Sequence, residues 1–264
     1  MKEIIKEKLK VKIFKTRALM GADAAGVISD KIKELLKTKE YVNIIFASAP
    51  SQNEFLAELN KKSVDWACVN AFHMDEYVGL GTADPQSFGY FIKERLFDKV
   101  ACREVHYLNG AAEDMEAECE RYTALLLKYP TDIVCLGIGE NTHLAFNNPH
   151  VADFNDQQIV KIVDLDEACR LQQVNDGCFK NIDAVPTHAL TLTIPALFKS
   201  HYAYAIAPGP LKANAIYYTI NSEISETYPS SILRTHNNAV LYIDEDSAAK
   251  ISWPWLSVSD AVEK

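Results

Sequence analysis

The stretch that decides the fold is "DIVCLGIG" (Asp132–Gly139), an apolar run that ends in two glycines and leads into "ENTHLAFNNP" (Glu140–Pro149). Apolar residues follow one another in this run, as they do in a strand that is covered on both faces. Similar runs occur along the rest of the chain, at Val11–Phe14, Tyr41–Ala49, Trp66–Met74, Val105–Gly110, Ala189–Ile194, Tyr202–Gly209 and Ala239–Asp244.

Segments of helical period separate these runs. In Ala111–Lys128, apolar residues such as Cys119, Tyr122 and Leu126 recur at steps of three or four, with charged residues between them. Alternation of strands and helices predicts an α/β fold with a mainly parallel sheet, in which ligands bind beyond the carboxyl ends of the strands. Three further helices are expected at Ala18–Lys37, Ser51–Asn60 and Lys212–Ile220.

The composition is that of one globular domain spanning residues 1–264, because no linker or repeat marks a boundary. A net charge of −9 argues against nucleic acid or an acidic membrane as partner. The six cysteines are scattered without a CxxC pair, which favours reduced thiols in the cytoplasm. The charged N-terminus does not resemble a signal peptide, and no apolar stretch is long enough to cross a membrane.

Polar side chains follow several of the apolar runs. Ser48, Ser51 and Gln52 come with or after Tyr41–Ala49, where a helix N-terminus could hold a phosphate. On this segment alone an ordinary serine cap is the simpler explanation, because the glycines usual in a phosphate turn are missing. After the next run, the adjacent carboxylates of Asp75 and Glu76 are either a general base with a raised pKa or a capping pair.

The glycine-rich turn after Asp132–Gly139 carries His143. A lone histidine is more often structural than catalytic, but polar groups at three independent strand ends strengthen the case for a site. Lys212, near the start of a helix, could pair with a phosphate or lie on the surface. Arg234 and His236 precede the last run and either reach a ligand or pair with acidic surface groups.

Several motifs together resemble the glucosamine-6-phosphate deaminase/isomerase family, whose superfamily includes the 6-phosphogluconolactonases. The resemblance is carried by the lysine turn at Lys212 and by "MDEYVGL" (Met74–Leu80), "DPQSFGYFI" (Asp84–Ile92), "GIGENTHLAFNNP" (Gly137–Pro149), "VPTHALTLTI" (Val185–Ile194) and "SILRTH" (Ser231–His236). It implies a Rossmann-like three-layer sandwich that binds a hexose 6-phosphate without a metal or other cofactor. It also implies conversion of glucosamine 6-phosphate and water to fructose 6-phosphate and ammonia.

The resemblance also implies roles for individual residues. Asp75 is similar to the base that moves a proton between C2 and C1, and His143 to the acid/base that opens the pyranose ring. Lys212 and the Ser48–Ser51 turn resemble the phosphate site. A carboxylate and a histidine suit these two tasks, because one must act over two neighbouring carbons and the other must exchange protons near neutral pH.

The chain departs from the family at this site, which makes it a divergent member. Where the family pattern has aspartate, glycine and glutamate, this chain has Asn141, Thr142 and Asn148, so that amides replace the two carboxylates beside His143. The glycine pair of the phosphate turn is replaced by Ala49–Pro50, and proline lacks an N–H donor. Arg170 and Gln173 are weaker candidates for the sugar pocket, because a helix-surface position explains them equally well.

We therefore predict a catalytic set of Asp75, His143, Asn141 and Asn148, and a substrate- and phosphate-binding set of Ser48, Ser51, Gln52, Glu76, Lys212 and Arg170. The first hypothesis is an isomerase/deaminase that acts on an amino-hexose 6-phosphate. A lactonase-like hydrolase and a hexose-phosphate sensor with little turnover remain as alternatives. The sequence leaves the sugar and the oligomeric state open, a homo-oligomer included.

Overall fold

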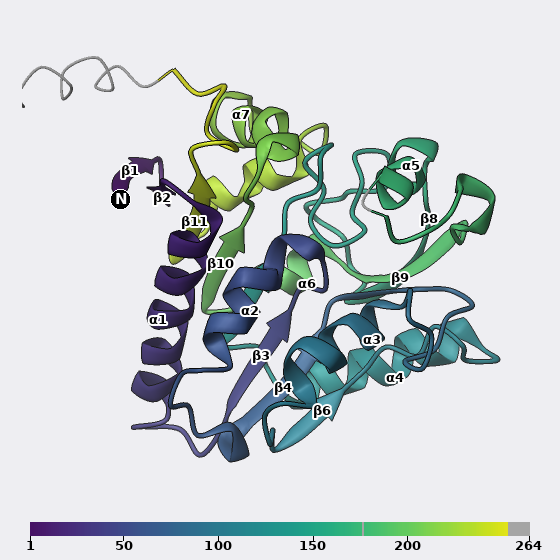
Figure 1. Cartoon of the computed structure of the whole chain (residues 1–264). Helices are drawn as coiled ribbons and strands as arrows, with labels where there is room; N and C mark the ends of the chain where they lie inside the picture. Colours follow the sequence, from purple (N-terminus) through teal and green to yellow (C-terminus); the bar gives the residue numbers. More distant parts are fainter. Residues whose placement is uncertain (176, 253–264) are drawn as a thin grey trace, which may run out of the picture.

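The structure, a computed structural model, describes residues 1–175 and 177–252. Within these ranges an eight-stranded sheet runs through the molecule in the order β1-β2-β11-β10-β7-β3-β4-β6 (Figure 1). All neighbours are parallel except β1 and β2, which form an antiparallel pair. The strands are β1 (Lys2–Lys6), β2 (Leu9–Phe14), β3 (Val42–Phe46), β4 (Val69–His73), β6 (Glu104–His106), β7 (Ile133–Leu136), β10 (Tyr202–Ile206) and β11 (Ala239–Asp244).

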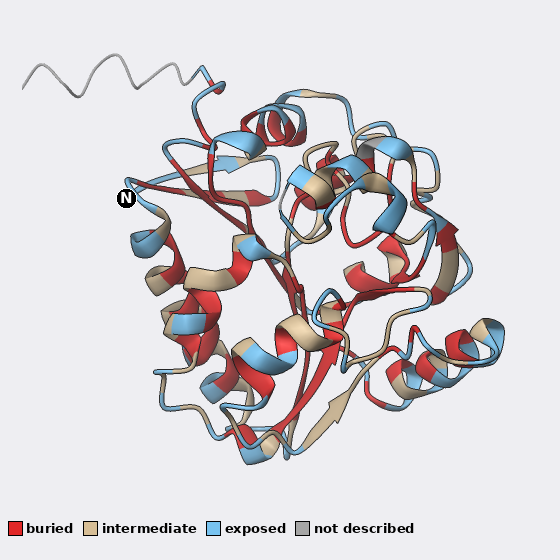
Figure 2. Ribbon diagram, turned by 45° about the vertical axis from the view of Figure 1, so that its right-hand side comes forward, coloured by how far each residue is buried: buried red, intermediate tan, exposed pale blue. Residues whose placement is uncertain are grey.

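Helices cover both faces of this sheet, so the predicted three-layer α/β architecture is confirmed. Along β3, Ile44 packs in the same apolar cluster as Met20 of α1, whereas Ile45 packs in the opposite cluster with Tyr122 of α4. The strands are accordingly buried in the middle of the molecule (Figure 2). One face carries α1 (Arg17–Leu35) and α2 (Asn53–Leu59), and the other carries α4 (Met115–Lys128), α6 (Ile194–Phe198) and α7 (Ala213–Asn221).

The run predicted at Ala189–Ile194 is a strand, but it does not belong to the main sheet. It forms β9 (His188–Leu192), which lies antiparallel between β5 (Asp75–Tyr77) and β8 (Val160–Asp164) in a second, three-stranded sheet. The hydrophobic pattern could not reveal this, because β9 is buried from its second residue onward like the strands of the main sheet. The second sheet covers an apolar cluster together with α5 (Glu167–Asn175).

Three of the four predicted helices begin later than the sequence suggested, whereas α1 begins one residue earlier, at Arg17. The helix expected from Ala111 begins at Met115, where the Asp114 side chain accepts a hydrogen bond from the Ala117 N–H at 3.0 Å. The helices expected from Ser51 and Lys212 are each preceded by a short 3₁₀ turn. The remaining elements are α3 (Phe88–Ile92) and the short turns η1 (Pro50–Gln52), η2 (Trp66–Cys68), η3 (Lys93–Phe97), η4 (Ile182–Ala184), η5 (Pro210–Lys212) and η6 (Pro229–Thr235).

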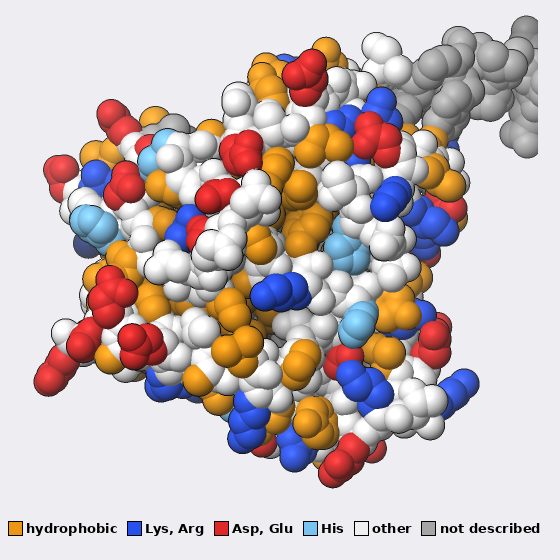
Figure 3. All heavy atoms as spheres, turned by 180° about the vertical axis from the view of Figure 1, so that it is seen from behind, with side chains coloured by type: hydrophobic (Ala, Val, Ile, Leu, Met, Phe, Trp, Pro, Cys, Tyr) orange, Lys and Arg blue, Asp and Glu red, His pale blue; other side chains and the backbone are white. Residues whose placement is uncertain are grey.

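The surface agrees with the acidic composition. On the face opposite to that of Figure 1, acidic and basic side chains are interspersed, and the described part of this face shows no broad basic stripe (Figure 3). Within residues 1–175 and 177–252, no helix is both long enough and apolar enough to span a membrane.

The order of the strands shows where a ligand crevice forms at the carboxyl ends of the sheet. The connections run outward in two directions from the centre, with β3 on one side of β7 and β10 on the other. The loops that follow β3, β7 and β10 therefore diverge at their carboxyl ends and leave a crevice between them. This crevice is where the polar groups of the predicted site meet.

Candidate active site

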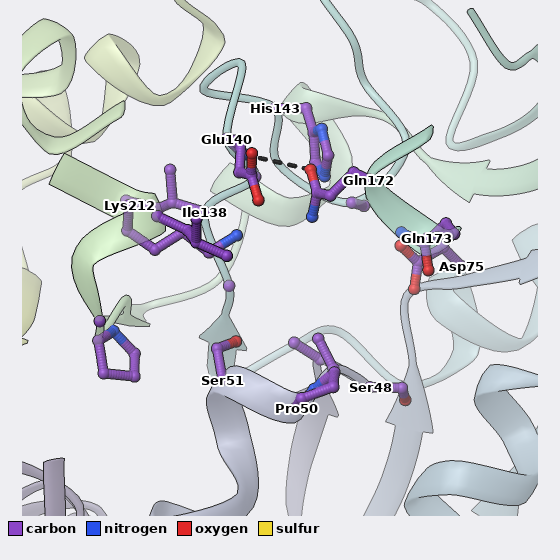
Figure 4. Close-up of a pocket in the computed structure, with 18 of the residues that line it drawn as sticks. Ser48, Pro50, Ser51, Asp75, Ile138, Glu140, His143, Gln172, Gln173 and Lys212 are labelled. Carbon is purple, nitrogen blue, oxygen red and sulfur yellow. Dashed lines mark hydrogen bonds between the residues drawn. The ribbon is translucent and has the colours of Figure 1, made fainter. Parts of the chain in front are cut away.

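A cavity of about 260 Å³ lies at the carboxyl ends of the central strands. It brings together five side chains that the sequence placed in the site, namely Ser48, Ser51, Asp75, His143 and Lys212. Ser51 and Lys212 lie toward one side of it and Asp75 toward the other (Figure 4). Side chains from strand ends more than a hundred residues apart in the sequence thus face one space.

Asp75 is the first residue of β5 and links the main sheet to the second sheet. It is 8% exposed, and burial raises the pKa of its carboxyl group to about 8, with a further contribution from the neighbouring Glu76. No hydrogen bond from a described residue holds this carboxyl group. A carboxylate with such a pKa is a much stronger base than an ordinary aspartate.

Glu76, which we predicted to bind substrate, points away from the cavity. Its carboxylate accepts hydrogen bonds from the N–H groups of Tyr77 at 2.9 Å, Phe88 at 3.1 Å and Gly89 at 2.7 Å. It is fully buried and holds the start of α3. The capping explanation therefore applies to Glu76, whereas its neighbour Asp75 faces the cavity.

The imidazole of His143 lies directly against the backbone of Gly139. A Cβ atom at position 139 would stand 2.1 to 2.3 Å from three ring atoms, so the ring can occupy this place only above a glycine. The turn is closed by a hydrogen bond from the Gly139 N–H to the His143 carbonyl at 3.0 Å. Within it Thr142 has φ +73°, a left-handed conformation that is costly for a β-branched residue.

A chain of amides fixes the tautomer of His143. The Asn141 Oδ1 accepts from the His143 backbone N–H at 3.2 Å and lies 2.7 Å from the ring Nδ1. Asn141 Nδ2 in turn donates to Asn148 Oδ1 at 3.1 Å. Because the oxygen already accepts from a backbone N–H, it also receives the proton of Nδ1, and Nε2 is left as the basic atom of the ring.

The site keeps this imidazole neutral. Burial, together with the positive charge of Lys212, lowers the pKa of His143 to about 3. A hydrogen bond with the Asn148 side chain opposes the shift only in part, because an amide carries no charge with which to stabilise an imidazolium. Asn141 and Asn148, which we predicted to be catalytic, do not line the cavity, and Asn141 contacts the His143 ring from behind it.

The predicted phosphate side of the cavity is built on the turn between β3 and α2. Ser48 Oγ is buried and has no hydrogen-bond partner among the described residues. Gln52, which we predicted to bind phosphate, is fully buried and does not line the cavity; its Nε2 donates to Ser51 Oγ at 3.0 Å and to the Ile206 carbonyl at 3.1 Å. Gln52 thus orients Ser51.

Three basic candidates lie outside the cavity. Arg170 donates through Nη2 to the carbonyls of Ile182 at 2.6 Å and Val185 at 3.0 Å, so it fixes the loop before β9 and does not line the cavity. Arg234 is 4% exposed and donates to backbone carbonyls at the C-terminal end of α7, and the ring of His236 lies 3.0 Å from the Ser200 carbonyl.

The cavity also contains residues that the sequence analysis missed. Arg17, Glu140 and Gln172 line it, and so does Gln173, which was a weaker candidate. Arg17 follows β2 closely, and an inspection of every strand end, the first included, would have found it. No group of three or more His, Cys, Asp or Glu side chains able to hold a metal ion occurs in the described ranges.

Comparison with protein families places this chain beside known enzymes. The family model described as "Glucosamine-6-phosphate isomerases/6-phosphogluconolactonase" matches residues 15–242. Glucosamine-6-phosphate deaminase of Bacillus cereus (strain B4264) is 36% identical over 221 residues, which cover 84% of this chain and 82% of the relative. The enzyme of that name from Bacillus thuringiensis (strain Al Hakam) is also 36% identical, with the same coverage.

Solved structures agree with this comparison. A monomeric glucosamine-6-phosphate deaminase superimposes with a TM-score of 0.82 at 31% identity, covering 90% of this chain and 98% of the other. The 6-phosphogluconolactonase of Thermotoga maritima has a TM-score of 0.73 at 20% identity, covering 90% and 100% of the two chains. The second likeness concerns the fold alone.

Proposed function

Because this chain belongs to the glucosamine-6-phosphate isomerase/6-phosphogluconolactonase family, we propose that it converts an amino-hexose 6-phosphate, glucosamine 6-phosphate or a close variant, to fructose 6-phosphate and ammonia. One observation carries the proposal. Asp75 and His143 face the same cavity as Lys212 and Ser51, so a base, a ring-opening group and an anion site share one space. Isomerisation of a cyclic hexose 6-phosphate requires all three groups in one site.

Asp75 performs the isomerisation in this proposal. Its carboxylate takes the proton from C2 of the open-chain sugar and returns it to C1, through an enolamine held out of water. With a pKa of about 8 the group is mostly protonated at neutral pH. The ammonium group on C2 of an amino sugar would stabilise the ionised, basic form of Asp75. This effect would favour amino sugars over neutral sugars as substrates.

Proton transfer to C1 leaves an imine at C2. Addition of water to this carbon and loss of ammonia then give the ketone of fructose 6-phosphate. One water is consumed and one ammonia released, and no oxidant or reductant takes part.

His143 assists the opening of the ring. Its Nε2 accepts the proton of the C1 hydroxyl and passes it to the ring oxygen as the C1–O5 bond breaks. Because the pKa of His143 is only about 3, the protonated intermediate is costly here. We therefore propose that this chain handles open-chain sugar efficiently and opens closed rings slowly.

A panel of amino and neutral hexose 6-phosphates tests the proposal. Ammonia release and exchange of the C2 proton in heavy water should occur with an amino-hexose 6-phosphate, and Asp75→Asn should slow both by roughly 10²- to 10⁴-fold. Saturable binding with no exchange would instead identify a sensor.

The neutral state of His143 favours a second candidate. A ring nitrogen without a proton can activate water against the carbonyl of 6-phosphogluconolactone, and this task requires no carboxylate beside the ring. Loss of the lactone, followed in the same panel, separates the two reactions. Lactone hydrolysis that survives Asp75→Asn and is lost in His143→Ala would replace the first proposal with this one.

A further inference from the structure

Arg17 is a cation on the cavity wall to which the proposed reaction has not yet given a role. It begins α1, directly after Thr16, whose side chain caps the helix by accepting from the Leu19 N–H at 3.2 Å. Its side chain reaches the same cavity as Ser51 and Lys212. A guanidinium in this place faces whatever anion Lys212 attracts.

Close packing of two helices brings Arg17 to this position. Gly21 lies one turn after Arg17 on the same face of α1. A Cβ atom at Gly21 would stand 2.8 Å from the backbone at Glu54 and Phe55, so α1 touches α2 at this glycine. The approach of the helices carries Arg17 over the turn that begins at Pro50.

The guanidinium is anchored at one nitrogen and has hydrogen-bonding capacity at the others. Nη2 donates to the Pro50 carbonyl at 3.1 Å and to Glu54 Oε2 at 2.9 Å. Nε is buried and has no acceptor among the described residues. Nη1 lies 3.8 Å from where a Cβ of Gly209 would stand, at the start of the turn that carries Lys212.

Two buried donors on residues that line the cavity thus have no acceptor in the part of the chain that the structure describes. One is the Arg17 Nε, and the other is the hydroxyl of Ser48, whose residue is 4% exposed. Leaving such donors without a partner is costly, and an anion in the cavity would supply acceptors. Pro50 has no N–H to offer an anion, so a donor from elsewhere is needed at this turn.

We propose that Arg17 is the second cation of the phosphate subsite, and that a phosphate monoester is held between its guanidinium and the Lys212 ammonium, with Ser51 beside them. This inference rests on the proposed function only in assigning a phosphorylated sugar to the cavity. Glu54 orients the guanidinium without occupying all of its donors. Arginine suits the task because its planar fork binds phosphate oxygens directionally.

Binding of inorganic phosphate and of the sugar phosphate, measured by calorimetry on the full chain, tests the inference. Arg17→Gln should raise both dissociation constants about 10- to 100-fold, and Arg17→Lys should raise them less. The matched control is Arg103→Gln, which removes the same charge at the amino end of β4, where Arg103 contacts Asn70 and Glu104. This control should bind phosphate like the wild type.

A purely structural role for Arg17 is tested by removing its partner. Glu54→Gln breaks the same ion pair but leaves the guanidinium in place and less neutralised. The proposal predicts unchanged or tighter phosphate binding in this variant. Equal weakening in Glu54→Gln and Arg17→Gln would show that only the contact between α1 and α2 matters, and wild-type binding in Arg17→Gln would also overturn the inference.

Binding and turnover separate this inference from the proposed function. If no amino sugar is converted but Arg17→Gln still weakens phosphate binding, only the reaction is wrong. If conversion occurs and Arg17→Gln has the wild-type KM and phosphate affinity, only the role of Arg17 is wrong. A thermal unfolding scan of each variant confirms that the protein compared is folded.

Discussion

The chemistry of this site depends on which residues are uncharged. Asp75 holds its proton up to about pH 8, and His143 stays neutral down to about pH 3. Between these limits the free enzyme keeps both groups mostly without charge, beside the ammonium of Lys212. A substrate that carries an ammonium group and a phosphate group would therefore bring most of the charge in the cavity with it. In a site whose carboxylate and imidazole were already ionised, the same substrate would change the net charge proportionally less.

The amide of Asn141 is the residue whose replacement should restore charge to His143. In Asn141→Asp the carboxylate would face the Nδ1–H, and Asn148 could turn its unpartnered Nδ2 toward it. We expect the pKa of His143 to rise by about 1 to 3 units. Titration of the histidine ring by NMR measures this shift.

The double variant Asn141→Asp with Asn148→Glu should also release ammonia from closed-ring substrate faster than the wild type. Asn155→Asp with Gln157→Glu, at two exposed positions, adds the same two negative charges and is the charge-matched control. If the pKa rises and ammonia release does not, the amides serve a different reaction.

At the scale of elements, the contact between α1 and α2 depends on one glycine and not on another in the same helix. A Cβ at Gly21 would meet backbone at 2.8 Å, whereas a Cβ at Gly26 would have nothing within 4 Å. Gly21→Ala should lower the free energy of unfolding by about 1 to 3 kcal/mol through overpacking. Gly26→Ala should raise it by about 0.5 to 1 kcal/mol through helix propensity.

Urea denaturation of Gly21→Ala and Gly26→Ala measures the two predicted changes in the free energy of unfolding. Because Arg17 lies one turn from Gly21, phosphate affinity should fall in Gly21→Ala and stay unchanged in Gly26→Ala. Equal stabilities in the two variants would mean that the helices separate without cost.

The alternation of elements was predictable from the sequence, but their pairing was only partly so. Continuous apolar runs correctly indicated strands buried on both faces, as in β3 and β7. The same signal could not show that β9 belongs to a second sheet, because partner choice depends on contacts distant in sequence. Periodicity likewise gave no sign of β1, whose residues are mostly exposed.

Asp75 and Ser48, which come just after strands, line the cavity as the sequence suggested. Other candidates do not line it, because their side chains point in a different direction from those of their neighbours in sequence. Glu76 faces the start of α3 and Gln52 faces the Ile206 carbonyl, because successive side chains in extended and turn structure diverge. Arg170 was misplaced for a different reason, since its partners are carbonyls of a loop that the sequence does not define.

At the scale of the whole molecule, the raised pKa of Asp75 couples folding to pH. The folded protein holds this proton at pH values where the unfolded chain has lost it, so the stabilisation is complete below the ordinary pKa of 3.8. It is lost as the pH rises through about 8. Relative to Asp75→Asn, the wild type should therefore lose about 2 to 5 kcal/mol between pH 4 and pH 9.

Urea midpoints for the two proteins at a series of pH values measure this difference. Glu76 also has a pKa raised by burial, to about 7, and it is present in both proteins, so only the part of its titration that is coupled to Asp75 remains in the difference. A constant difference between wild type and Asp75→Asn across the range would show that Asp75 titrates normally.

The amides beside His143 also bear on how the protein ages. Asparagine converts spontaneously to aspartate when the nitrogen of the following residue attacks the side-chain carbonyl, and such a change here would introduce the very charge that the site lacks. Asn148 precedes Pro149, whose nitrogen carries no hydrogen, and Asn141 precedes the β-branched Thr142, which is fixed at φ +73°. The residues that follow the two asparagines should therefore slow their deamidation, so that the charge of the site stays unchanged over the lifetime of the protein.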